Sequence, residues 1–156
     1  KKEKGIDVLL TAFRQLDNTY QLDLYGPLMG YQEKQLFGNN YRYCGVLQSE
    51  NVVISLKKND VLLLPTFWDG EGYPGIILEA LSIGIPIVST YQGGIPEIVT
   101  DGYNGFLVEP KNVEQLIRAI KKLDNVDYKT LSRNALSSFE HFDADIVNKK
   151  VWDIIK

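Results

Sequence analysis

Segments with helical and extended hydrophobic spacing alternate along almost the whole chain. Apolar residues at helical spacing predict helices over residues 6–16, 74–81 and 113–123. Continuous apolar runs predict strands over residues 60–64 and 85–89. Runs of this kind are typical of parallel strands that are buried on both faces. The alternation therefore predicts a parallel sheet with helices on both faces.

Weaker signals fill the intervals between these elements. Ser49 and Asn112 stand where helix N-caps are expected, and Gly84 just past the end of a helix. Further strands are predicted at 20–25, 41–44 and 105–108, and further helices at 31–37, 49–56, 95–99, 127–139 and 144–155. We interpret residues 1–156 as a single Rossmann-like α/β domain, a doubly wound parallel sheet in three layers.

Composition and charge narrow the classes of function. The length of 156 residues fits one domain, and the net charge of -3 argues against a nucleic-acid groove. A single cysteine, Cys44, and a single histidine, His141, exclude a disulfide framework and a metal centre with several histidines. No apolar run approaches the ~20 residues of a membrane span. We therefore expect a cytoplasmic protein.

The loop after Leu64 carries the richest set of candidate groups. Ligands of doubly wound sheets bind at the carboxyl ends of the strands, where this loop is expected. Its glycines let the backbone approach a ligand closely. The N–H groups of Gly75, Ile76 and Ile77 would be free at the start of the next helix and could bind a phosphate. A turn-rich connection without a ligand is an equally supported alternative from composition alone.

Two acids in this region call for different explanations. Glu79 stands within a predicted helix that is apolar on nearly every side, so we expect it to be buried and to need a partner. The vicinal diol of a ribose offers two donors to one carboxylate. The alternative is a side chain that points to solvent. Glu71 precedes the helix in a loop expected to be exposed, where it suits contact with a polar ligand group, although surface acids are common.

The spacing of these acids resembles a family signature. Glu71 and Glu79, with seven residues between them, resemble the acid pair of retaining glycosyltransferases that have two Rossmann-like domains, the glycosyl transferases group 1. The resemblance continues through residues 84–88 and 93–108, and Lys4-Gly5 resembles the family's Lys-Gly pair. It covers essentially the whole chain, and only the C-terminal, donor-binding half of that family.

The resemblance implies a role for each matching position. Lys4 resembles the lysine that neutralises the donor diphosphate, and Glu79 resembles the acid that binds the ribose hydroxyls. Glu71 resembles the acid that contacts and orients the transferred sugar. The family has a backbone segment that wraps the sugar and phosphate, and the matching residues here are Gly72, Tyr73, Pro74, Gly75 and Ile76. Leu47 lies where the family contacts the nucleobase. The expected donor is a UDP- or GDP-linked sugar, and the resemblance implies transfer without a bound metal or cofactor.

The chain also departs from the family pattern. The order Tyr73-Pro74-Gly75 stands where the family has an aromatic residue directly followed by glycine. The family's strand ending in Gly-Arg, which precedes its Lys-Gly, and its acceptor-binding N-terminal domain are both absent. That strand is central in a sheet ordered 3-2-1-4-5-6, so we expect the native gene to encode more upstream.

The resulting hypothesis is the donor-binding domain of a retaining glycosyltransferase that transfers a hexose to a polysaccharide or glycolipid. Its expected partners are a nucleotide sugar, an N-terminal domain and a saccharide or lipid-linked acceptor, with peripheral association at the inner face of a membrane. We expect this fragment alone to bind a nucleoside diphosphate weakly and to transfer no sugar. The alternatives are a domain of a sugar-nucleotide epimerase or phosphorylase, and a non-catalytic interaction module of Rossmann type. A Glu79 that points away from the loop after Leu64 would favour the module.

Overall fold

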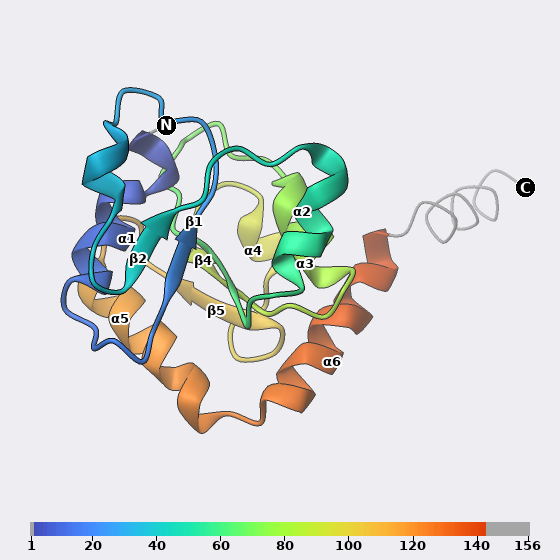
Figure 1. Ribbon diagram of the computed structural model, residues 1–156. Helices are drawn as coiled ribbons and strands as arrows, with labels where there is room; N and C mark the ends of the chain where they lie inside the picture. The colour runs from blue at the N-terminus through green and yellow to red at the C-terminus, as the bar shows by residue number, and fades with distance from the viewer. Residues whose placement is uncertain (1, 143–156) are drawn as a thin grey trace, which may run out of the picture.

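Helices and parallel strands alternate through residues 2–142, the part of the chain that the computed structural model describes (Figure 1). In chain order the first elements are η1 (Lys2–Lys4), α1 (Ile6–Phe13), β1 (Leu22–Leu24), η2 (Glu33–Leu36), β2 (Tyr41–Tyr43), α2 (Ser49–Leu56) and β3 (Leu62–Leu64). They are followed by α3 (Gly75–Leu81), β4 (Ile87–Thr90), α4 (Ile95–Ile98), β5 (Gly105–Val108), α5 (Val113–Lys122), η3 (Leu123–Asn125), α6 (Tyr128–Phe139) and η4 (Glu140–Phe142). The helix predicted over 144–155 lies outside the described residues.

The strands form two parallel sheets. β1 pairs with β2, with Leu22 opposite Tyr41, and β3, β4 and β5 pair in that order, with Leu63 opposite Val88. Within the described residues no strand pairing joins the two sheets. The predicted α/β class is confirmed, and the sheet is divided between β1 and β3.

Burial of β3 differs from the expectation. All three residues of β3 are only half-buried, whereas every residue of β4 and β5 is buried. In the described part of the chain β3 pairs with β4 alone, so its other edge has no strand beside it. A strand at the edge of a sheet keeps part of its surface accessible even when its residues are apolar. The prediction of a strand buried on both faces is therefore wrong for β3 and correct for β4.

Two hydrophobic clusters lie on opposite faces of the strands and establish the three layers. One cluster lies beneath α1 and α5, includes Val88 and Phe106, and also takes in Leu22 and Leu24 of the smaller sheet. The other lies beneath α2, α3 and α6 and includes residues next to these in sequence, such as Ile87. Successive side chains along a strand point to opposite faces, which explains this division. Figure 1 shows α5 and α6 on different sides of the strands.

The sequence predicted some helix ends correctly and others not. Asn112 caps α5 as expected, because its side chain accepts a hydrogen bond from the Gln115 N–H at 2.9 Å. Ser49 is the first residue of α2 and not its cap; Gln48 takes the cap position without a side-chain bond. The helix predicted at 31–37 is a 3-10 turn, η2. No helix within residues 2–142 is long and apolar enough to cross a membrane.

Candidate functional site

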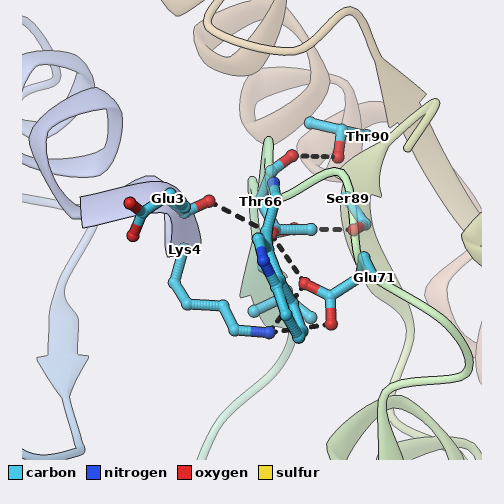
Figure 2. A network of polar contacts seen from close by, with 8 residues as sticks. Glu3, Lys4, Thr66, Glu71, Ser89 and Thr90 are labelled. Carbon is cyan, nitrogen blue, oxygen red and sulfur yellow. Dashed lines mark hydrogen bonds and ion pairs between the residues drawn. The ribbon is translucent and has the colours of Figure 1, made fainter. Parts of the chain in front are cut away.

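A partly buried ion pair joins the first turn of the chain to the loop between β3 and α3. The side chain of Glu71 is 4% exposed, and the Lys4 Nζ atom lies 2.7 Å from each of its carboxylate oxygens. The Thr66 hydroxyl donates to Glu71 Oε2 at 2.7 Å (Figure 2). Charge-assisted bonds of this kind offset the cost of burying a carboxylate. Of the residues predicted from sequence, the structure thus brings Lys4 and Glu71 together, and it shows that the expectation of an exposed Glu71 was wrong.

Glycine at position 5 explains how Lys4 reaches this loop. The Phe67 N–H donates to the Glu3 carbonyl at 2.8 Å, which ties η1 to the residues after β3. Gly5 has φ of 82°, and a Cβ atom added there would lie 2.1 Å from the Pro65 carbonyl oxygen. Only glycine accepts both this conformation and this approach without strain. The Lys-Gly pair seen in the sequence therefore has a structural cause, since the glycine lets the lysine come within reach of Glu71.

The backbone of Glu71 is held from the opposite side by the loop after β4. The Gly94 N–H donates to the Glu71 carbonyl at 3.2 Å. Gly93 has φ of 54°, and a Cβ atom there would lie only 1.7 Å from the same carbonyl oxygen. The Thr90 hydroxyl donates to the Thr66 carbonyl at 2.6 Å, and the end of β4 is thereby fastened to the end of β3. Three segments that are distant in sequence therefore meet at Glu71: the first turn and Thr66 contact its carboxylate, and the loop after β4 contacts its backbone.

The Trp68 ring and a shallow hollow lie beside the Lys4–Glu71 pair. The Lys4 Nζ atom lies 5.0 Å from the centroid of the Trp68 ring, within the range of a cation–π contact. A hollow of about 390 Å³ is lined by Lys2, Glu3, Met29 and Trp68. Met29 belongs to the loop after β1, so the hollow lies where the loops after β1 and β3 meet. This is the end of the sheet where doubly wound folds bind their ligands.

Glu79 lies apart from this cluster. It stands in α3 with its side chain half-exposed, and no hydrogen bond or ion pair joins its carboxylate to another residue within 2–142. The expectation of a buried Glu79 was wrong, because α3 buries Ile77, Ala80 and Leu81 and leaves the positions between them partly open. The expectation of a free N–H at Ile77 was also wrong, since that group donates to the Pro74 carbonyl at 2.9 Å.

The remaining predicted positions surround the cluster without contacting its charges. Gly72, Tyr73 and Gly75 are exposed, and Pro74 and Ile76 are half-buried. The Tyr73 hydroxyl donates to the Glu97 carboxylate, which raises the pKa of Tyr73 above its usual value, and its ring packs edge-on against Phe142 at 6.1 Å between centroids.

Leu47 is half-buried in the loop between β2 and α2. The Gly26 N–H donates to the Gly45 carbonyl at 2.9 Å, so this loop is joined to the loop after β1. The structure therefore places Leu47 beside the smaller sheet, and within residues 2–142 no hydrogen bond or ion pair links it to Lys4 or Glu71. Within residues 2–142, no group of three or more His, Cys, Asp or Glu side chains is arranged to hold a metal ion.

Comparison with known proteins identifies the family of this chain. Residues 1–136 match the model of the family described as Glycosyl transferases group 1, and the chain belongs to that family. It is 29% identical over 172 residues to WcaL of Salmonella typhimurium, a glycosyltransferase named for colanic acid biosynthesis; the match covers 99% of this chain and 42% of that protein. It is also 29% identical over 132 residues to the amylovoran biosynthesis glycosyltransferase AmsK of Erwinia amylovora, covering 76% and 32%.

Two solved structures have a similar fold over nearly the whole of this chain. The chain superposes on Alr3699/HepE of Anabaena in complex with UDP-glucose with a TM-score of 0.84 at 24% identity, covering 99% of this chain and 46% of that one. Sucrose-phosphate synthase from Thermosynechococcus elongatus gives a TM-score of 0.82 at 21% identity, covering 99% and 42%. At these identities the likeness establishes the Rossmann-like fold. The chain spans less than half the length of each of these four proteins.

Proposed function

We propose that this chain is the donor-binding domain of a retaining glycosyltransferase that transfers a hexose from a nucleoside-diphosphate sugar to a polysaccharide or glycolipid. The observation that carries the proposal is the buried Glu71 carboxylate, which is paired with the Lys4 ammonium at the carboxyl end of β3. This pair offers an acceptor for sugar hydroxyls beside a positive charge for a diphosphate. Family membership supports the transferase over the epimerase and phosphorylase alternatives.

Lys4 supplies the charge that the chemistry needs. An ammonium group has three N–H donors, and two of them are directed to the Glu71 oxygens, which leaves one for a phosphate oxygen. Cleavage of the sugar–phosphate bond develops negative charge on the departing nucleoside diphosphate, and a fixed cation stabilises that charge. In this proposal Lys4 does so without a bound metal ion or cofactor.

The other site residues have supporting roles in the proposal. The half-exposed carboxylate of Glu79 accepts hydrogen bonds from the two ribose hydroxyls, and Leu47 lies against the base. The segment Gly72–Ile76 wraps the sugar and the phosphates. The complexes of Alr3699/HepE with UDP and UDP-glucose favour a uridine nucleotide, and the names of WcaL and AmsK favour a polysaccharide acceptor.

Nucleotide titration of the 156-residue chain tests the proposal. The titration is followed by NMR on ¹⁵N-labelled protein, and we expect UDP or GDP to shift the amide signals around Lys4, Thr66 and Glu79. The expected dissociation constant is about 1 mM, which corresponds to a binding free energy of roughly -4 kcal/mol. Glu79→Gln should weaken this binding about tenfold, while Glu114→Gln on the exposed face of α5 should leave it unchanged. An absence of specific shifts with UDP, GDP and ADP contradicts the proposal. An unchanged affinity in Glu79→Gln would contradict the ribose role of that residue.

A further inference from the structure

We infer that Thr66 is a positioning residue that fixes the Glu71 carboxylate so that Oε1, and not Oε2, is offered to a hydroxyl of the donor sugar. The inference rests on the proposed function and deepens it, because it names the group that orients the sugar-binding acid. Neither the sequence pattern nor the family resemblance drew attention to Thr66.

Thr66 has the burial and contacts that such a role needs. It is 0% exposed, and its Oγ1 atom lies 2.7 Å from Glu71 Oε2 and 3.1 Å from the Glu3 carbonyl oxygen. It also accepts a bond from the Trp68 N–H at 3.3 Å. A hydroxyl group has a single proton to donate. The shorter contact and the charged acceptor assign that proton to Glu71.

Lys4 cannot orient the carboxylate by itself. Its Nζ atom lies 2.7 Å from Oε1 and 2.7 Å from Oε2, so it treats the two oxygens alike. It also stands on a long side chain that is 34% exposed. Thr66 contacts Oε2 alone, and among the contacts shown in Figure 2 it is the one that distinguishes the two oxygens.

The two carboxylate oxygens of Glu71 then differ in how many further hydrogen bonds they can accept. Each oxygen of an ionised carboxylate can accept about two hydrogen bonds. Oε2 accepts one from Lys4 and one from Thr66 and is therefore saturated, whereas Oε1 accepts a single bond within residues 2–142, the one from Lys4. One acceptor position therefore remains on Oε1, and the Lys4 ammonium that contacts this oxygen keeps its third N–H donor. A sugar hydroxyl and a phosphate oxygen can thus be bound side by side.

The backbone around Thr66 is rigid enough to transmit this orientation. The Thr66 carbonyl accepts a bond from the Thr90 hydroxyl at 2.6 Å, and the Leu64 carbonyl accepts one from the Ser89 hydroxyl at 2.6 Å. Both donors belong to β4, where they are fully buried. The position of the Thr66 hydroxyl is therefore fixed relative to β4, the central strand of the larger sheet.

Two matched variants test the role. Thr66→Val keeps the shape of the side chain and removes its hydroxyl, while Thr66→Ser keeps the hydroxyl. The dissociation constants of UDP and UDP-glucose are measured for each chain by NMR titration, and the ratio of the two constants reports the gain in affinity due to the sugar. We expect the wild-type chain to bind UDP-glucose several-fold more tightly than UDP. Thr66→Val should lose this gain while its UDP affinity changes less than about twofold, and Thr66→Ser should keep it.

The outcomes separate this inference from the proposed function. If Thr66→Val keeps the sugar gain, or weakens UDP and UDP-glucose equally, the positioning role is overturned while nucleotide binding stands. If the wild-type chain binds UDP and UDP-glucose with equal affinity, the contact between Glu71 and the sugar is overturned as well. If neither ligand binds, the proposed function fails and this inference falls with it.

Discussion

Glu71 and Glu79 are the same residue type, eight positions apart, in opposite environments. Glu71 follows a glycine in a loop, and the residue as a whole is 6% exposed. Its carboxylate accepts hydrogen bonds from Lys4 and Thr66. Glu79 is flanked by apolar residues in α3, yet it is half-exposed and has no hydrogen bond or ion pair within residues 2–142. The sequence suggested the reverse for both. Burial of a carboxylate is decided by the segments that pack on it, and the apolar character of its neighbours in sequence is a poor guide.

The difference also separates stability from ligand binding. The environment of Glu71 is built from η1, the end of β3 and the loop after β4, so changes there should affect the whole fold. Glu79 contributes little that the fold depends on, so changes there should affect a ligand alone. The experiments below, arranged from the largest expected effect to the smallest, examine this contrast.

Gly93→Ala should destabilise the chain most. The added Cβ atom would lie 1.7 Å from the Glu71 carbonyl oxygen, in a left-handed conformation that costs about 1–2 kcal/mol for alanine even without a clash. We expect the free energy of unfolding in urea to fall by about 3 kcal/mol. Gly72→Ala is the matched control, because no atom lies within 4 Å of its added Cβ. Equal effects of the two substitutions would show that the loop after β4 does not hold Glu71.

Lys4→Met should have the next largest effect. The substitution keeps the length of the side chain and leaves the Glu71 carboxylate buried with Thr66 as its remaining side-chain donor. Removing one partner of a buried pair is strongly destabilising, and the partial exposure of Lys4 reduces the loss to about 2 kcal/mol. Urea denaturation measures it, with Lys57→Met at the exposed end of α2 as the control. A loss no greater than that of the control would show that Glu71 is stable without its cation.

Glu79→Gln should leave the fold nearly unchanged. A half-exposed carboxylate that has no partner among residues 2–142 contributes little, so the free energy of unfolding should change by less than about 0.5 kcal/mol. Urea denaturation measures this change, and nucleotide titration of the same protein preparation measures the affinity. A loss of stability comparable to that of Lys4→Met would remove the contrast between the two acids.

The smallest effect concerns the link from this loop to α4. The bond from Tyr73 to Glu97 raises the pKa of the tyrosine above 10.0, so the folded state holds the phenol proton more tightly than the unfolded state does. Its contribution to stability is therefore complete below about pH 10 and is lost as the pH rises through the folded-state pKa. NMR titration of the Tyr73 ring should give a lower midpoint in Glu97→Gln than in the wild type. An unchanged midpoint would mean that the bond does not persist in solution.

The sequence predicted the layers of the fold well because they depend on periodicity. The apolar runs of β4 and β5 and the amphipathic pattern of α5 are local signals, and so is the cap at Asn112. The exposure of β3 was not predictable in this way, because it depends on whether another strand lies beside it.

The candidate site was predictable only in part, for the same reason. Lys4 and Glu71 were found through the family motif, and their direct contact was not expected, because it depends on the approach of Gly5 to Pro65. Thr66 was missed. The available signal was a hydroxyl residue directly after an apolar strand and a proline, but nothing in the sequence showed that it would be buried against Glu71.

The division of the sheet has a consequence for handling the protein. Within residues 2–142, β1 pairs only with β2 and β3 only with β4, so each presents an edge whose N–H and C=O groups no strand satisfies. Such edges are templates for strand addition by another copy of a chain, the same process that underlies domain swapping and aggregation. Protein concentration is thus a variable in every titration described above, and light scattering at two concentrations belongs beside each binding curve.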